Sequence, residues 1–190
     1  MGTRLPIVWR RIDRPRIVRA APPYAMREVM YMSETVRRPG WKGLALILAL
    51  TLLLGGAAGL LNRDGMQRYE ALTKPGFAPP GWVFPVVWTL LYAAMSVSLW
   101  LALREGRPWW KLLLVYIVQL AVNLAWPFLF FTLGALGLAF WWLLLLLVLI
   151  ILLMCATFPR SAPAGWLLVP YAAWVSFAGV LNFAIARLNP

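Results

Sequence analysis

The stretch KPGFAPPGWVFPVVW, residues 74–88, places four prolines and four aromatic side chains where a long apolar run begins. Proline fixes φ and carries no backbone N–H, so the prolines before residue 81 keep this connection extended and stiff. Pro85 falls in the first turn of the apolar run, where the N–H groups of a helix lack intrahelical partners anyway. The stretch therefore predicts a helix preceded by a rigid loop, interpreted as a lid over a pocket. The lid residues are Lys74, Pro75, Phe77, Pro79 and Pro80.

Composition indicates that this helix crosses a membrane. Of the 190 residues, 63% are hydrophobic and only 13% are charged, which is more apolar surface than a water-soluble core could cover. Five apolar segments follow one another, at about 43–61, 82–103 and 109–131, then one ending near residue 157 and one ending near residue 187. Each can cross a hydrocarbon layer of roughly 30 Å at about 1.5 Å per residue. The predicted fold is all-α, a multi-pass integral membrane protein with a bundle of five transmembrane helices and a long proline-rich first loop.

Positive charge is concentrated before the first span. The chain has 18 Lys and Arg against six Asp and Glu, and residues 1–42 hold ten of the former and three of the latter. That region therefore carries +7 of the total +12. The sequence predicts a basic, disordered extension over 1–41 and the five-helix domain over 42–190. A basic flank beside a span is expected to meet lipid headgroups, so membrane lipid is a predicted partner and nucleic acid is not.

Histidine is absent, and Cys155 is the only cysteine. A His-based catalytic triad, a His-ligated haem and a His-rich zinc site are therefore excluded. The acidic residues Asp64, Glu70 and Glu105 fall in predicted loops, which leaves no acid or base within a span. No metal and no required cofactor are expected, and a role other than enzyme is favoured.

The second span carries aromatic residues on one face. Trp88, Tyr92 and Met95 follow the spacing i, i+4, i+7, which places them together on a helix. Trp88 is predicted to form a pocket wall. Trp82, at the start of the span, fits an interfacial aromatic belt better than a pocket.

The third span repeats the same spacing with polar residues. Gln119, Asn123 and Trp126 form one stripe in the middle of a helix that crosses hydrocarbon. Because buried amides need partners, the stripe is expected to face inwards, either joining helices or contacting a ligand. Pro127 is expected to kink the helix and to free a carbonyl, which would widen the bundle locally.

The fifth span shows a comparable face, formed by Tyr171, Trp174, Ala178 and Leu181. Its small residues either allow close helix packing or leave room for a ligand. The same choice stays open for the Gly-x-x-x-Gly pattern at 55–59, which could pack within the bundle or form a dimer seam.

Tryptophans at depth on three spans suggest a binding cavity. Trp88, Trp126 and Trp174 lie away from the predicted span ends. A cavity walled by these rings with few polar groups would suit a large, flat, mostly apolar molecule, held by stacking and burial rather than by charge.

Several separated motifs resemble the tryptophan-rich sensory protein and translocator protein family, TspO/MBR. They are Tyr69 with Leu72, KPGFAPPGWVFPVVWTLLY, QLAVNLAWPFLFF, and VPYAAW followed by AGVLNF. The resemblance runs from about residue 53 to the C-terminus and implies a five-helix bundle, often a homodimer, whose cavity binds porphyrins. The family's ligand contacts correspond to Ala58, Trp82, Phe84, Trp88, Asn123, Trp126, Trp174, Ala178 and Leu181. Tyr92 joins this set because it shares the face of Trp88.

The resemblance implies a porphyrin-binding sensor or translocator in a membrane, expected to be a bacterial cell membrane. Its ligand would be protoporphyrin or a haem-like tetrapyrrole, bound as a ligand and not as a required cofactor. One alternative is a light-dependent oxidase that degrades porphyrin, with Trp88 and Trp174 as catalytic residues. Another is a structural membrane scaffold. Phe183 stands where animal members carry tyrosine in a sterol-recognition segment, which argues against a sterol role here.

Overall fold

The computed structural model describes residues 39–106 and 108–190. The predicted extension over 1–41 therefore lies outside the described residues, apart from 39–41. The described residues form helices and connections without a strand, which confirms the predicted all-α class. The helices are α2 (Trp41–Leu61), α3 (Gly65–Ala71), α4 (Val83–Leu103), α5 (Trp110–Pro127), the π-helical turn η1 (Phe128–Thr132), α6 (Leu136–Thr157), α7 (Ala162–Trp166) and α8 (Val169–Leu188).

Five of these segments are long and apolar enough to span a membrane. They are α2, α4, α5 with η1, α6, and α7 with α8, and they contain 21 to 27 residues each. At about 1.5 Å per residue, the shortest reaches the roughly 30 Å of a hydrocarbon layer. The protein is thus a multi-pass integral membrane protein, and the predicted spans are confirmed.

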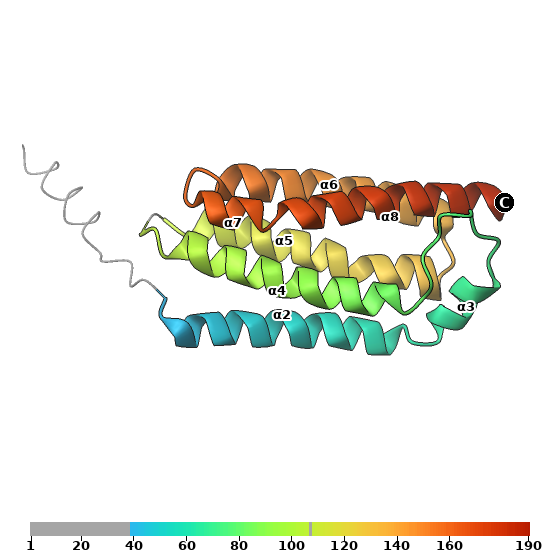
Figure 1. The fold of residues 1–190 in the computed structure, drawn as a ribbon, viewed down its shortest axis with the longest axis horizontal. Coiled ribbons are helices and arrows are strands. Elements are labelled where there is room, and N and C mark those ends of the chain that lie inside the picture. The colour runs from blue at the N-terminus through green and yellow to red at the C-terminus, as the bar shows by residue number, and fades with distance from the viewer. Residues whose placement is uncertain (1–38, 107) are drawn as a thin grey trace, which may run out of the picture. The chain divides into compact units, whose positions relative to one another are not determined.

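The helices pack side by side, and α2 is the most peripheral of them. In Figure 1, α2 runs along one side, α6 and α8 along the opposite side, and α4 and α5 between them. The most extensive packing is between α6 and α8, between α2 and α4, and between α5 and α6. In α2 only one residue, Thr51, is buried, whereas α4, α5, α6 and α8 each have six or more buried residues. The core therefore belongs mainly to these four helices.

Two contacts fix α2 against its neighbours. The hydroxyl groups of Thr51 and Tyr116 are hydrogen-bonded at 2.9 Å, which joins α2 to α5. Gly55 faces Tyr92 on α4 so closely that a Cβ at residue 55 would lie 2.2 Å from Cε2 of the ring. The absence of a side chain at Gly55 thus lets the two helices approach. For this glycine the structure favours packing within the bundle.

Pro127 ends the regular part of α5. The chain continues as the π-helical turn, in which the N–H of Leu133 donates to the carbonyl of Phe128 at 3.0 Å. The guanidinium of Arg68 donates to the carbonyl of Phe131 at 3.1 Å and also to that of Thr132. These bonds satisfy carbonyls that a helix end leaves without partners. The proline therefore changes the helix type at this end of the bundle.

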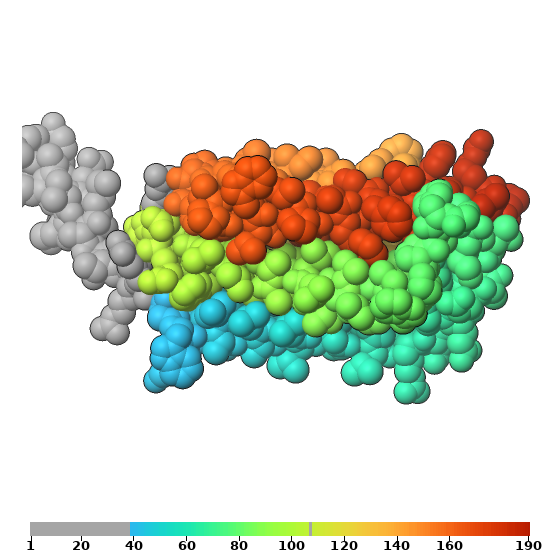
Figure 2. Space-filling view, in the orientation of Figure 1, coloured from blue at the N-terminus to red at the C-terminus, as the bar shows by residue number. Residues whose placement is uncertain are grey.

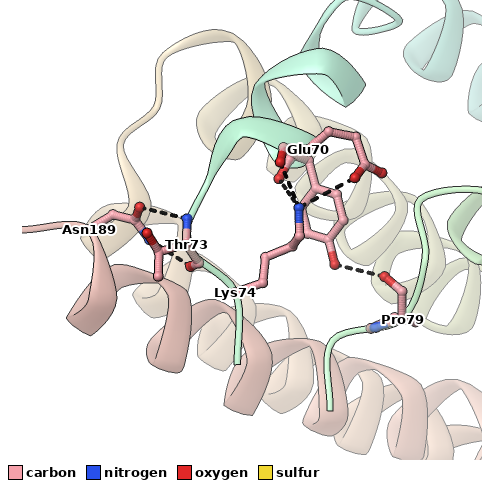
Figure 3. A network of polar contacts seen from close by, with 6 residues as sticks. Glu70, Thr73, Lys74, Pro79 and Asn189 are labelled. Atoms are coloured by element: carbon pink, nitrogen blue, oxygen red, sulfur yellow. Dashed lines mark hydrogen bonds and ion pairs between the residues drawn. The ribbon is translucent and has the colours of Figure 1, made fainter. Parts of the chain in front are cut away.

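The first loop is more ordered than the sequence predicts, because 65–71 forms the short helix α3. The side chain of Lys74 donates to the carbonyls of Tyr69 at 3.0 Å and Glu70 at 2.8 Å. Asn189 bonds the backbone of Thr73 through both its amide atoms, at 3.0 and 2.9 Å. Figure 3 shows these bonds, which join the loop to the end of α8.

Tyr69 anchors the proline-rich part of the loop. Its hydroxyl donates to the carbonyl of Pro79 at 2.9 Å. Burial, with a smaller contribution from the nearby Glu70 carboxylate, raises the pKa of Tyr69 above its ordinary value, so this donor keeps its proton at neutral pH. Phe77 packs edge to face with Phe177 of α8, with ring centroids 6.3 Å apart. In Figure 2 the loop covers one end of the helices beside the last turns of α8.

A second short helix, α7, precedes α8. Residues Ala162–Trp166 are helical, although the stretch 159–165 contains two prolines. The hydroxyl of Ser98 on α4 donates to the carbonyl of Ala164 at 2.7 Å, and Gly165 lies directly against the Phe158 ring. Tertiary contacts therefore hold a segment whose two prolines suggest an irregular connection.

Gly55→Ala is expected to be less stable than the matched variant Gly56→Ala. A methyl group at residue 55 would collide with Tyr92, whereas nothing lies within 4 Å of the same position at residue 56. Both changes gain the same helix propensity, while overpacking costs about 1–3 kcal/mol. Denaturant titration in detergent micelles measures the difference in unfolding free energy. Equal stability of the two variants would contradict the close contact between α2 and α4.

Candidate ligand-binding cavity

A cavity of about 650 Å³ lies between α2, α4 and α5. This volume is within the range of roughly 300–1,000 Å³ that is typical of small-molecule sites. The lining is mostly apolar. Its residues are Leu52, Gly55, Gly56, Ala58, Gly59, Leu60, Asn62, Arg63, Met66, Phe84, Pro85, Trp88, Thr89, Tyr92, Asn123, Trp126, Pro127 and Phe131.

Glycines of α2 leave the space that the cavity occupies. Gly56 and Gly59 line it, and a Cβ added at either would meet no atom within 4 Å. Ala58 adds only a methyl group to the same stretch. The pattern at 55–59 thus serves two purposes, since Gly55 brings α2 onto Tyr92 and Gly59 opens room beside it.

Indole and phenol rings form the facing wall. Trp88 stacks on Tyr92 one turn along α4, with centroids 5.7 Å apart and planes 30° from parallel. Trp126 of α5 is 4% exposed and packs edge to face with Phe131 at 5.8 Å. These rings present flat π surfaces on two helices, as the spacing of the tryptophans predicts.

A chain of hydrogen bonds lies behind the wall. The Tyr92 hydroxyl donates to Oδ1 of Asn123 at 2.7 Å, and Nδ2 of Asn123 donates to the Tyr171 hydroxyl at 2.7 Å. Tyr171 in turn donates to Oε1 of Gln119 at 2.9 Å. The chain links α4, α5 and α8, and Asn123 also lines the cavity. The two roles that the sequence leaves open for Asn123, joining helices and facing a ligand, are therefore geometrically compatible.

The whole polar stripe of the third span faces inwards, as predicted. Gln119, Asn123 and Trp126 are between 0% and 4% exposed. Nε1 of Trp126 donates to Oδ1 of Asn182 at 3.4 Å, and the Asn182 amide donates to the carbonyl of Leu136 at 2.8 Å. Within the described part of the chain, Nε2 of Gln119 is buried without a hydrogen-bond partner. Its inward position follows from the cost of exposing an amide to hydrocarbon.

Six of the ten predicted ligand contacts line this cavity. They are Ala58, Phe84, Trp88, Tyr92, Asn123 and Trp126. The structure thus brings together predicted residues from three helices. These six residues therefore lie at the cavity, and ligand binding by them stays a prediction.

The other four predicted contacts lie elsewhere. Trp82 is 69% exposed, in keeping with an interfacial position. Ala178 and Leu181 border a separate void of about 10 Å³, beyond Phe84 and Trp126. Trp174 packs against the edge of Phe84, with centroids 6.0 Å apart, and does not line the cavity.

Consequently the structure brings two of the three deep indoles, Trp88 and Trp126, to one cavity and leaves Trp174 on the far side of Phe84. None of the five lid residues lines the cavity either. Tyr69, which anchors the lid, packs edge to face with Phe84 at 5.2 Å. The five lid residues therefore stand behind the cavity wall, which Tyr69 supports through its contact with Phe84.

Sequence reasoning missed several lining residues near the end of α2. Asn62, Arg63 and Met66 follow the glycine-rich stretch, and Thr132 donates to Oδ1 of Asn62 at 2.6 Å. The cluster of small residues at 55–59, followed by the first polar residues of the loop, is the sequence feature that could have indicated these lining positions. Only the packing of the helices reveals that these residues line the same cavity as Trp88.

Comparison with known proteins places this helical membrane protein with its aromatic cavity in a defined class. Residues 45–188 match the TspO/MBR family. The Tryptophan-rich protein TspO of Chlorobaculum tepidum is 38% identical over 154 residues, which cover 77% of this chain and 96% of the relative. The Translocator protein of Bos taurus is 38% identical, with 75% and 89% covered. The Tryptophan-rich sensory protein of Cereibacter sphaeroides is 36% identical, with 76% and 92% covered.

The chain belongs to the TspO/MBR family. The match includes α2, α4, α5, α6 and α8 almost completely. The resemblance inferred from the motifs is confirmed.

Tyr171→Phe is expected to lower stability by about 1–3 kcal/mol, because loss of one hydroxyl leaves both Asn123 and Gln119 short of a partner. Ser176→Ala on the same helix is the control. Its hydroxyl is exposed and donates to the Ala172 carbonyl at 2.8 Å, so its removal should change stability by no more than about 0.5 kcal/mol. Thermal unfolding in micelles compares the two. Equal melting temperatures would contradict a structural role for the hydrogen-bond chain.

Proposed function

We propose that this membrane protein binds a porphyrin in the cavity between α2, α4 and α5 and acts as a sensor or translocator of tetrapyrroles. The observation that carries the proposal is the pairing of two deep indoles, Trp88 and Trp126, with an apolar cavity of about 650 Å³. A porphyrin is flat, aromatic and largely apolar. Such a molecule gains from stacking on indole rings and from leaving water.

The polar part of the lining also fits a tetrapyrrole. Tyr92 and Asn123 are hydrogen-bonded to each other and border the cavity, so a neutral polar edge lies beside the apolar wall. Hydroxyl and amide groups of this kind can hydrogen-bond polar substituents at the edge of the macrocycle. The names of the relatives, which refer to sensing and translocation, are consistent with a protein that responds to or moves a small ligand.

Light-driven oxidation of the porphyrin by dioxygen remains the alternative activity. It would use Trp88, which lines the cavity, and Trp174, whose nearest aromatic neighbours in the described chain are Phe84 and Phe177. Because Phe84 lies between Trp174 and the cavity, the two proposed catalytic indoles would not stand equally close to one ligand. The binding function is therefore the stronger proposal.

Titration with protoporphyrin IX in the dark tests the proposal. The wild-type protein in micelles should shift the porphyrin absorbance band and lose tryptophan fluorescence in a saturable manner. Trp88→Ala should weaken binding by about tenfold, since it removes a stacking surface and the apolar area of one indole. Trp141→Ala is the matched control, because this indole is 67% exposed and lies on α6 away from the cavity.

Three results would count against the proposal. The first is that both signals stay unchanged when porphyrin is added. The second is that Trp88→Ala and wild type bind porphyrin equally. The third is that porphyrin does not raise the melting temperature, as expected for a scaffold without a small ligand. Illumination of the bound complex then separates the alternatives: a sensor or translocator leaves the porphyrin absorbance intact, whereas an oxidase that uses Trp88 destroys it and slows in Trp88→Phe.

A further inference from the structure

A thioether side chain, that of Met66, borders the cavity. The described residues include the methionines Met66, Met95 and Met154, and their surroundings differ. Met66 lies in the first turn of α3 and lines the cavity together with Trp88 and Trp126. Met95 is 0% exposed, whereas Met154 of α6 is partly buried, and neither lines the cavity. A ligand in the cavity would therefore meet the sulfur of Met66 and not that of the other two.

The same sulfur packs against the segment that follows the lid. Gly81 comes directly after the lid residue Pro80 and is buried. A Cβ added at Gly81 would lie 2.7 Å from Sδ of Met66 and 2.9 Å from Oε1 of Glu70. The absence of a side chain at Gly81 thus lets the thioether and the carboxylate approach the backbone there. Met66 contacts the cavity on one side and the end of the lid segment on the other.

We infer that Met66 is a site of light-dependent oxidation to methionine sulfoxide, and that this oxidation lowers the affinity of the cavity for its ligand. The inference rests on the proposed function, because a bound porphyrin would be the sensitiser. An excited porphyrin passes its energy to dioxygen and returns unchanged to its ground state. The resulting singlet oxygen is electrophilic and adds to the sulfur of a thioether.

The reaction needs water, and the rim of the cavity beside Met66 is wet. One thioether, one dioxygen and one water give one sulfoxide and one hydrogen peroxide. The sulfur loses two electrons, and dioxygen gains them together with the two protons of water. Arg63, which also lines the cavity, has a side chain that is 79% exposed, so water reaches this part of the lining.

Oxidation would disturb both contacts of Met66. A sulfoxide is polar and larger than a thioether, so it fits an apolar lining poorly. Its oxygen accepts hydrogen bonds, as does the Glu70 carboxylate that lies against the same Gly81, and two acceptors in one place repel each other. The oxidised side chain should therefore leave its packed position. The ligand then loses apolar contact at the rim, and the lid segment loses a support.

The first test maps oxidation by peptide mass spectrometry. The full chain in micelles is loaded with equimolar protoporphyrin IX and illuminated in air. Sulfoxide should form about fivefold faster at Met66 than at Met154, while Met95 stays reduced, because oxidation follows access to the oxidant. Rose bengal, added as a sensitiser to protein without porphyrin, makes the same oxidant outside the cavity and should remove this preference. Equal rates at Met66 and Met154 with bound porphyrin would overturn the inference.

The second test measures affinity for fresh protoporphyrin IX in the dark, before and after illumination. Wild type should lose about tenfold, whereas Met66→Leu should keep its own dark value, because leucine preserves an apolar side chain that this oxidant does not attack. Met154→Leu is the matched control and should lose affinity as wild type does. Met66→Gln, which introduces a polar group without light, should bind more weakly than Met66→Leu. Equal dark affinity of these two variants would contradict the effect of a polar group at residue 66.

Reversal separates the thioether from the indoles of the cavity, which the same oxidant also attacks. Methionine sulfoxide reductase returns a sulfoxide to the thioether but does not repair an oxidised indole. Treatment of illuminated wild type with this enzyme should restore the dark affinity. An affinity loss that the enzyme leaves in place, or that Met66→Leu shares, would overturn the role of Met66 while porphyrin binding stands. If wild type binds no porphyrin in the dark, the proposed function itself fails and the inference falls with it.

Discussion

The amide of Asn123 needs hydrogen-bond partners at a position where the chain crosses hydrocarbon, and this requirement organises the bundle. Its oxygen accepts from Tyr92 on α4, and its nitrogen donates to Tyr171 on α8, which bonds Gln119 in turn. Apolar packing against lipid-like neighbours gives little preference for one arrangement of helices over another, whereas unpaired amides in hydrocarbon are costly. The polar chain therefore fixes α4, α5 and α8 relative to each other.

The cavity lies where this fixed group of helices meets the peripheral helix α2. Thr51 is the only buried residue of that helix, which packs along α4 and touches Tyr92 through Gly55. Gly56 and Gly59 line the cavity without a side chain, which leaves room beside the indoles. A flat ligand can gain binding energy by stacking on the rings. The hydrogen bonds that join α4, α5 and α8 stabilise the bundle and so offset the cost of leaving the cavity open.

The sequence predicts well which segments are helical and which face of a helix points inwards. It predicts poorly which helices lie next to each other. Apolar length locates the five spans, and the spacing of Gln119, Asn123 and Trp126 identifies an inward face, because both properties are local. The position of Trp174 behind Phe84 depends on which helices are neighbours, and periodicity carries no such information. Short helices such as α3 and α7 were also missed, since contacts with distant residues stabilise them. Arg63 was not predicted to line the cavity, because its position depends on how the loop leaves α2.

Filling the cavity from the α2 side tests the account most directly. Gly59 lines the cavity, and a Cβ added there would meet no atom within 4 Å, whereas Leu53 of the same helix is 69% exposed and does not line it. The account predicts that Gly59→Phe remains folded, with a melting temperature no lower than that of wild type, and loses at least tenfold in protoporphyrin affinity. Leu53→Phe should bind as wild type does. Undiminished affinity in a folded Gly59→Phe protein would mean that porphyrin binds elsewhere.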